Sequence, residues 1–541
     1  MQMVQIEQLI QGVFPYNNLS INCLIFNKST QTSDNNKRIA KNTLLLYVRM
    51  LFMMVIGLYT SRVILDKLGE VDFGIYNVVG GFVTMFAVIS GAMTSATQRF
   101  LSFEIGKGKE GNVKGIFSTM IYIHLFLALL VLIVGEIVGV WFLNTHMNFP
   151  ADRYGAANWV FQLSLLVFIL NVINVPYNGA LIAYEKMSAF AYFSIFDAVF
   201  KLAICYVITL TPFDKLVVYA VLMAFIQILL LLMYFAYCRL KFSECRFTGK
   251  YNKEYGKNVG SFVGWNLIGS LSGIAKEQGV NVVLNMFFGP AVNAARGVAY
   301  QVLSKLNGFV SNFQMALNPQ IIKNYASGEK ENMFKLVFRG AKLSYLLLLT
   351  LSLPVVVEAP LILSVWLKEV PDYTVVFLQI VIFTALLNTL SNPLIISMHA
   401  SGKVRDYQIV VGGLSLLTLP IVYVVLKIGA EPYWAMIVAF IVELACHFAR
   451  LYMLVRSIQF PMVRFLKNVT LRVYLITALS VLLPLIAYNL IDIVLLRFLT
   501  VCILSVISTL GLGYYLGFNK ADRMTIRTKV VNIVKNKILK R

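Results

Sequence analysis

The sequence predicts an all-α, polytopic membrane protein with about 14 transmembrane helices. Of its 541 residues, 59% are hydrophobic and only 13% are charged, and the mean hydropathy is +0.75. A soluble protein carries about 25% charged residues, and a chain of this size cannot cover its surface with so few polar groups. The composition therefore excludes a soluble enzyme, a nucleic-acid-binding protein and a disordered scaffold.

Fourteen segments are apolar over the roughly 20 residues that a helix needs to cross a bilayer. Because backbone groups in lipid need partners within a helix or a closed barrel, and no barrel-like alternation is visible, we expect helices. The seventh and eighth segments are the most polar. The expected spans are 44–65, 72–98, 116–143, 157–183, 188–210, 216–240, 260–287, 291–319, 334–357, 373–398, 407–428, 433–456, 472–491 and 493–518.

Lys and Arg residues collect in alternate connecting segments and in both terminal segments, which accounts for the net charge of +22. Because cytoplasmic loops are enriched in these residues, the pattern predicts cytoplasmic N- and C-termini in a multi-pass membrane protein. We expect the basic segments to contact anionic membrane lipids and not nucleic acid. The other connecting segments hold only Lys67, Arg153, Lys215, Lys368, Lys427 and Arg497.

The spans divide the chain into two lobes and three smaller segments. Residues 1–36 lack the basic start of a signal peptide, so we expect either a disordered cytoplasmic extension or a stretch upstream of the working start near Lys37. The expected order is extension 1–36, first lobe 37–240, basic linker 241–259, second lobe 260–458, two further helices 459–518 and basic tail 519–541.

Two sets of residues recur at fixed offsets, which predicts an internal repeat. Asn171, Pro176 and Lys186 match Asn388, Pro393 and Lys403 at an offset of 217. Gln98, Phe103 and Gly106 match Gln320, Tyr325 and Gly328 at an offset of 222. Chance similarity among apolar helices is the alternative. A repeat of six spans gives two parallel six-helix copies that face each other, a transporter architecture.

Prolines at matching positions of the two copies are candidate hinges. Pro176 and Pro393 each remove a backbone hydrogen bond and favour a bend in the helix.

The eighth span carries one polar face, within about 80° of arc on an ideal helix. Such a polar face is unfavourable in lipid, so we expect it to contact other helices or water. The alternative interpretation is that its polar residues only hold neighbouring helices together. We expect Arg296, Tyr300, Asn307 and Gln314 to bind substrate. The whole face comprises Asn293, Arg296, Tyr300, Ser304, Asn307, Ser311, Gln314 and Asn318.

Ionisable residues inside spans are candidate functional groups, because each is expensive to insert. If residues near the basic ends of spans, such as Arg450, are counted with the cytoplasmic segments, the basic ones are Arg49, Arg62, Lys201, Lys276, Arg296 and Lys305, and the acidic ones are Glu136, Asp197, Glu277 and Glu443. This excess of cations suits an anionic substrate such as a pyrophosphate head group.

The spacing of these charges suggests roles and pairings. Arg49, Arg62, Lys276 and Arg296 are substrate-binding candidates, although Arg49 could also extend to the headgroups. The candidates for ion coupling are Asp197, Lys201, Glu277 and Glu443. The i,i+4 spacing predicts a pair between Asp197 and Lys201 and allows one between Glu443 and His447.

Motifs for other chemistry lack their context. Gly106, Gly108 and Gly111 form a G-x-G-x-x-G without a preceding strand, and no Walker loop follows. The six cysteines show no metal-binding spacing. We therefore expect neither an enzyme nor a cofactor or metal site.

From Lys37 onward the chain resembles the Wzx-type polysaccharide (O-antigen) flippases of the MATE-like MOP exporter superfamily. The resemblance rests on short motifs, namely Arg38 to Tyr47, Tyr59 to Arg62, Asp72 to Gly81, Gln98 to Phe100 and Asn318 to Gln320. It implies two six-helix lobes in a V, with two further helices. It also implies that the substrate is an undecaprenyl-pyrophosphate-linked oligosaccharide for O-antigen, capsule or exopolysaccharide synthesis. The mechanism implied is alternating access coupled to a proton or sodium ion, with polysaccharide-assembly proteins as possible partners.

Proteins of two other functional classes are expected to show different sequence features. A MATE-type multidrug or cation antiporter is expected to have twelve spans and a cavity dominated by carboxylates. A membrane-embedded polymerase or glycosyltransferase needs a large outer loop, whereas the longest here runs from about Asn144 to Ala156.

Overall fold

The computed structural model describes residues 41–57, 59–60, 63–64, 66–69, 72, 75–76, 79, 87–146, 150–367, 370–517 and 523. These residues form helices joined by short connections, with no strand among them. Ten helical segments within them are long and apolar enough to cross a membrane. The protein is therefore an all-α, multi-pass membrane protein, as its composition predicts. The expected extension 1–36 and nearly all of the expected tail 519–541 lie outside the described residues.

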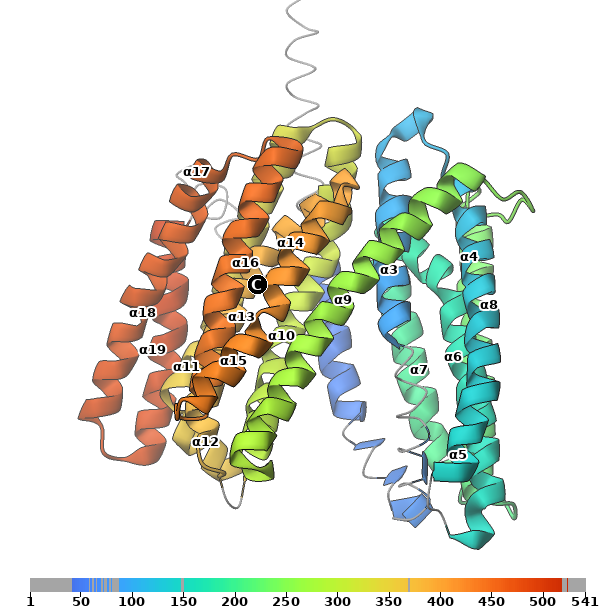
Figure 1. Cartoon of the computed structure of the whole chain (residues 1–541), viewed down its shortest axis with the longest axis horizontal. Helices are drawn as coiled ribbons and strands as arrows, with labels where there is room; N and C mark the ends of the chain where they lie inside the picture. The colour runs from blue at the N-terminus through green and yellow to red at the C-terminus, as the bar shows by residue number, and fades with distance from the viewer. Residues whose placement is uncertain are drawn as a thin grey trace, which may run out of the picture.

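The N-terminal half is an upright bundle (Figure 1). Residues 41–57 are helical. Its labelled helices are α3 (Ala87–Gly106), α4 (Val113–Val134), α5 (Val140–His146), α6 (Tyr154–Ala183), α7 (Met187–Val207) and α8 (Lys215–Lys241). A π-helical turn, Gly135–Gly139, joins α4 to α5 into one apolar span.

The C-terminal half forms a second bundle, with a helical hairpin at its outer edge (Figure 1). Its helices are α10 (Pro290–Ala326), α11 (Lys330–Val357), α12 (Ala359–Trp366), α13 (Thr374–Ser401), α14 (Val404–Leu416), α15 (Thr418–Lys427), α16 (Trp434–Ile458), α17 (Met462–Phe465), α18 (Leu471–Leu490) and α19 (Val494–Leu512). The short helix α12 is not predicted by the sequence. The hairpin of α18 and α19 packs on α11.

Helix α9 (Lys253–Phe288) crosses from one half to the other (Figure 1). It begins about two turns before the predicted span at 260, because the Asn252 side chain caps its N-terminus by accepting hydrogen bonds from the backbone N–H groups of Glu254 and Tyr255. It packs on α3 and α4 of the N-terminal half and on α14 and α15 of the C-terminal half. The two halves are thus joined by a continuous helix.

The residues of the predicted repeat occupy corresponding places in the two halves. Those matched at an offset of 222 lie in the last three turns of α3 and α10 or just after α10, and two of them, Phe103 and Tyr325, contact each other with ring centroids 6.5 Å apart. Pro176 lies inside α6 and Pro393 inside α13, and both helices continue past the proline.

The two halves contact each other at the end where α3 and α10 terminate. The Arg99 guanidinium of α3 donates hydrogen bonds to the carbonyl oxygens of His399 (3.0 Å) and Ala400 (3.3 Å), at the C-terminus of α13. A cation is favourable there because the last carbonyl groups of a helix carry partial negative charge. Gly402 follows with φ +75°, and a Cβ atom there would lie 2.7 Å from Arg99 Nη2.

A buried carboxylate forms a second bridge at the same end. Glu185, on the connection after α6, accepts hydrogen bonds from Gln320 (2.7 Å) and Lys323 (2.6 Å) of α10. Its backbone carbonyl accepts a further hydrogen bond from Asn42. One acidic residue of the N-terminal half thereby holds the last turns of α10.

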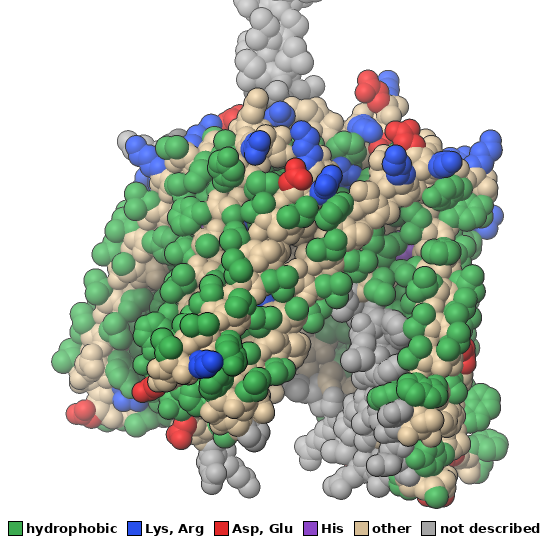
Figure 2. All heavy atoms as spheres, viewed as in Figure 1, with side chains coloured by type: hydrophobic (Ala, Val, Ile, Leu, Met, Phe, Trp, Pro, Cys, Tyr) green, Lys and Arg blue, Asp and Glu red, His purple; other side chains and the backbone are tan. Residues whose placement is uncertain are grey.

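Lys and Arg side chains gather at this same end of the molecule, and the visible surface is hollowed between the two halves towards the other end (Figure 2). The contacts of Arg99 and Glu185 therefore close the space between the two halves at the basic end of the described structure.

Gly106 permits the close approach of α3 and α10 and gives a test of this contact. A Cβ atom at Gly106 would lie 2.8 Å from the Cα and carbonyl oxygen of Lys323, whereas one at Gly91 of the same helix meets nothing within 4 Å. Overpacking of this kind costs about 1–3 kcal/mol. We expect Gly106→Ala to lower the melting temperature of the purified protein and Gly91→Ala to leave it unchanged or raise it. Equal melting temperatures for the two variants would contradict the contact.

Candidate functional site

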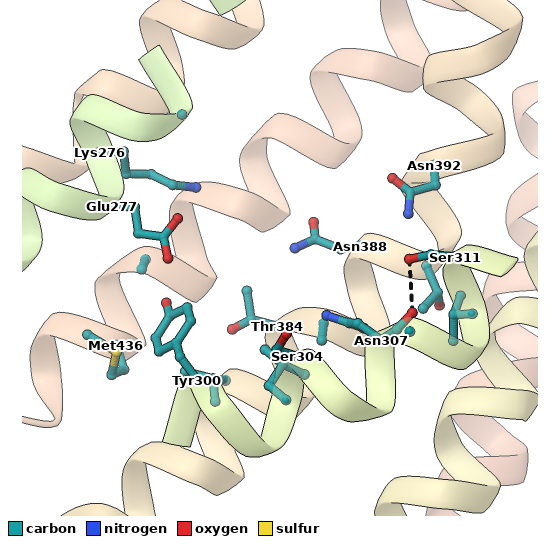
Figure 3. Close-up of a pocket in the computed structure, with 18 of the residues that line it drawn as sticks. Lys276, Glu277, Tyr300, Ser304, Asn307, Ser311, Thr384, Asn388, Asn392 and Met436 are labelled. Carbon is teal, nitrogen blue, oxygen red and sulfur yellow. Dashed lines mark hydrogen bonds between the residues drawn. The ribbon is translucent and has the colours of Figure 1, made fainter. Parts of the chain in front are cut away.

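A cavity of about 560 Å³ lies inside the C-terminal half, between α9, α10, α13 and α16 (Figure 3). Polar side chains from three of these helices reach it. Its lining comprises Gly273, Lys276, Glu277, Val280, Arg296, Tyr300, Leu303, Ser304, Asn307, Gly308, Val310, Ser311, Gln314, Val381, Thr384, Ala385, Asn388, Thr389, Asn392, Met436 and Ala439.

The polar face predicted on the eighth span forms one wall of this cavity. Its members from Arg296 to Gln314 line the cavity, and Asn293 and Asn318, at its two ends, do not. Figure 3 shows Tyr300, Ser304, Asn307 and Ser311 following one another along α10. The predicted substrate-binding residues Arg296, Tyr300, Asn307 and Gln314 are therefore brought together.

The second wall carries amide and hydroxyl groups from α13. Thr384, Asn388 and Asn392 recur every four residues, so they share one face of the helix. Asn392 donates a hydrogen bond to the Gln314 side chain (3.1 Å), which donates in turn to Ser344 (3.2 Å). Asn307 and Asn388 face the same space (Figure 3), and the described residues leave both side-chain amides without a hydrogen-bond partner.

One end of the cavity is charged. Lys276 and Glu277 project from α9 into the cavity, with Glu277 directed towards Tyr300 (Figure 3). The Glu277 side chain is exposed to the cavity, and no described residue forms a hydrogen bond or ion pair with its carboxylate.

Arg296 lies beside these residues and is only 5% exposed. Its guanidinium donates to the Asn281 side chain (2.8 Å) and to the backbone carbonyl of Glu277 (3.3 Å). It also lies 4.4 Å from the ring centroid of Tyr300, within range of a cation–π interaction. Arg296 Nε has no partner in the described structure. All these partners are neutral, so the positive charge of Arg296 is not balanced by a directly bound carboxylate.

Behind the cavity, one buried carboxylate is shared by two cations. Glu443 of α16 accepts a hydrogen bond from Arg450 at 2.7 Å and another from Lys276 at 3.2 Å. Arg450 also donates to Tyr407 (3.3 Å) and Ser391 (3.3 Å). Lys276, Arg296 and Arg450 against Glu277 and Glu443 leave this end of the cavity with a net charge of +1.

The pairing of Glu443 with His447, which the i,i+4 spacing allowed, does not form. The His447 Nδ1 atom is instead hydrogen-bonded to Ser391 (2.8 Å). Glu443 instead pairs with Arg450 of α16 and Lys276 of α9, and sequence spacing within one helix could not reveal the contact with Lys276.

The remaining candidates lie away from the cavity. The Arg49 guanidinium lies 4.4 Å from the ring centroid of Phe190, in the N-terminal half. The predicted pair of Asp197 and Lys201 forms on α7, with a nitrogen–oxygen distance of 2.7 Å. Arg62 lies outside the described residues. The structure therefore brings Lys276 and Arg296 to one cavity and leaves Arg49 outside its lining.

The site residues that were not predicted from the sequence include Asn388, Asn392 and Arg450. Asn388 was predicted only as part of the repeat, and neither it nor Asn392 as a site residue, although with Thr384 they recur every four residues along one face. Arg450 lies near the basic end of its helix and so resembles a residue that only sets topology. It is seven residues from Glu443 and hence on the same face of the helix, a signal that could have found it.

Comparisons with known proteins agree with this architecture. The MatE family model matches residues 46–207, in the N-terminal half. No curated protein matches the sequence.

Several solved structures are similar to the whole bundle. One described as a MATE in the bent conformation is 13% identical, with a TM-score of 0.67, and covers 80% of this chain and 97% of that chain. A variant of the Vibrio cholerae MATE transporter VcmN is 17% identical, with a TM-score of 0.67 and coverage of 80% and 99%. A MOP superfamily transporter from Pyrococcus furiosus, described as having a binding pocket of reverse polarity, is 11% identical, with a TM-score of 0.62 and coverage of 79% and 96%. These likenesses show that the protein has the MATE transporter fold.

The carboxylates of Glu277, in the cavity lining, and of Glu443, behind it, should differ in their effect on stability. Glu443→Gln leaves the buried Arg450 and the partly exposed Lys276 without their shared counter-ion, and breaking a buried pair costs about 3–5 kcal/mol. Glu277→Gln removes a charge that no described residue pairs with. In thermal unfolding of the purified protein, we expect a clear loss of stability for Glu443→Gln and a change within about 0.5 kcal/mol for Glu277→Gln. Similar losses for both variants would contradict the pairing.

Proposed function

We propose that the protein is a flippase that moves undecaprenyl-pyrophosphate-linked oligosaccharide repeat units across the bacterial inner membrane by alternating access. The product would supply O-antigen, capsule or exopolysaccharide assembly. The observation that carries this proposal is the cavity, which combines cations at one end with amides and hydroxyls along two walls.

The chemistry of the cavity suits such a substrate. Lys276 and Arg296 would bind the pyrophosphate, since charge-assisted hydrogen bonds to phosphate are strong. Asn307, Asn388, Gln314 and Tyr300 would donate to and accept from sugar hydroxyls. Arg49, outside the cavity lining, and Arg62 would contact the head group as it moves between the two halves.

The contacts between the two halves suggest which state the structure represents. Under the positive-inside rule the basic end is cytoplasmic, with both termini on that side. With its basic end closed, the structure would then represent an outward-facing state. To open inward, the protein would break the contacts of Arg99 and Glu185, while Pro176 and Pro393 would let α6 and α13 bend.

Transport against a gradient needs coupling to an ion, a proton or sodium. Glu277 is the leading candidate because it faces the cavity without a partner among the described residues. Asp197 and Glu443 hold internal cations, Lys201 for the first and Lys276 with Arg450 for the second, so each would have to break an ion pair to exchange an ion.

A MATE-type multidrug or cation antiporter is the second candidate, and the same Glu277 favours it. A free carboxylate beside the Tyr300 ring could bind an organic cation. The fold suits both functions equally. The net charge of +1 at this end of the cavity favours the anionic substrate.

Removal of a cavity cation should separate these functions. We expect Arg296→Ala to lower surface polysaccharide at least about tenfold, which corresponds to about 1.4 kcal/mol of lost binding, while Arg296→Lys retains part of the activity. Arg497→Ala is the control, because Arg497 pairs with Glu358 at the base of α19, outside the cavity lining.

The measurement is the amount of surface polysaccharide in a deletion strain that expresses each variant at equal level. Normal polysaccharide with Arg296→Ala would remove this residue from the mechanism. Drug resistance on overexpression, lost with Glu277→Gln and unaffected by Arg296→Ala, would support the antiporter instead.

A further inference from the structure

The two cations that share Glu443 are held very differently. Arg450 is 9% exposed and donates to Glu443, Tyr407 and Ser391, from α16, α14 and α13. Lys276 lines the cavity, its side chain is 22% exposed, and Glu443 is the one partner for its ammonium group among the described residues. The Lys276 contact is also the longer of the two, 3.2 Å against 2.7 Å.

We propose that Lys276 is a releasable cation that leaves Glu443 to bind the anionic head group, and that Arg450 is the positioning residue that allows this release. The inference rests on the proposed function, because it specifies how one cation of that cavity becomes available to its substrate.

The argument depends on what Lys276 leaves behind. A buried carboxylate without a counter-ion is strongly unfavourable, and Glu443 is only 5% exposed. With Arg450 in place, Glu443 keeps a charged partner when Lys276 turns away. Lys276 then exchanges one charge-assisted hydrogen bond for another, to a phosphate oxygen, so the exchange is nearly balanced.

Arg296 makes the contrast clear. Its partners are an amide, a backbone carbonyl and an aromatic ring, so it can attract an anion without leaving a carboxylate. Arg296 is therefore always available to an anion, whereas Lys276 becomes available only when it exchanges Glu443 for the anion.

The test is calorimetric titration of inorganic pyrophosphate into the purified full-length protein in detergent. Arg450→Gln makes Lys276 the sole counter-ion of Glu443, so we expect at least about a tenfold loss of affinity, equivalent to about 1.4 kcal/mol. Arg450→Lys keeps the charge and should stay near the wild type. The double variant Arg450→Gln/Glu443→Gln should bind within about threefold of Glu443→Gln alone, because neither holds Lys276 back.

Arg497→Gln provides a matched control, since Arg497 also donates to a buried glutamate, Glu358, at 2.9 Å. We expect it to lower the melting temperature and to leave the pyrophosphate affinity unchanged.

Three outcomes would overturn the proposal while leaving the proposed function intact. These are unchanged affinity in Arg450→Gln, a double variant that binds as poorly as Arg450→Gln, and unchanged affinity in Lys276→Gln. If the Glu443→Gln variants do not fold, equal affinities for Arg450→Lys and Arg450→Gln would overturn it. A wild-type protein that does not bind pyrophosphate would instead refute the anionic cavity and, with it, this inference.

Discussion

The placement of polar side chains in hydrocarbon is the constraint on which this structure depends. A charged residue at the centre of a bilayer costs about 2.5–3.5 kcal/mol on insertion scales, and an unpaired polar group is also unfavourable there. Helix α10 carries Arg296 and a row of amides and hydroxyls, so lipid cannot cover that face. Helices α9, α13 and α16 cover it instead. The cavity lies between these helices because their polar side chains do not fill the space that they enclose.

The two halves of the protein place their charged side chains within the membrane differently. In the N-terminal half, Asp197 and Lys201 pair within α7, and Arg49 lies on an aromatic ring. In the C-terminal half, the charges come from α9, α10 and α16 and meet at one cavity. Among the described residues, Arg49, Asp197 and Lys201 of the N-terminal half thus lie outside the cavity lining, whereas these charged residues of the C-terminal half surround it. If the proposed transport is correct, the substrate head group is held by the C-terminal half, while the contacts of Arg99 and Glu185 control which side of the membrane it faces.

Much of this could be predicted from the sequence, for physical reasons. Helix positions follow from runs of apolar residues, and the wall formed by α10 follows from the period of an α-helix, because both depend on one segment at a time. The pair of Asp197 and Lys201 is local in the same way. The contact of Glu443 with Lys276 could not be predicted, since Lys276 lies 167 residues away, and spacing along the helix allowed a pair with His447 that does not form. Arg49 was grouped with Arg296 because both are cations in spans, yet only packing decides which helices enclose a common space.

The central claim is that the C-terminal cavity takes up an anionic head group from an outward-facing state. Asn388 lies in the cavity wall with a free side chain, so a single cysteine at this position (Asn388→Cys), in an otherwise cysteine-free protein, reports on the cavity. The most direct measurement is the labelling of this cysteine by a membrane-impermeant thiol reagent added outside intact spheroplasts, with and without inorganic pyrophosphate. The account predicts labelling from outside that pyrophosphate slows. Labelling that pyrophosphate does not affect, or a cysteine that the external reagent never reaches, would contradict it.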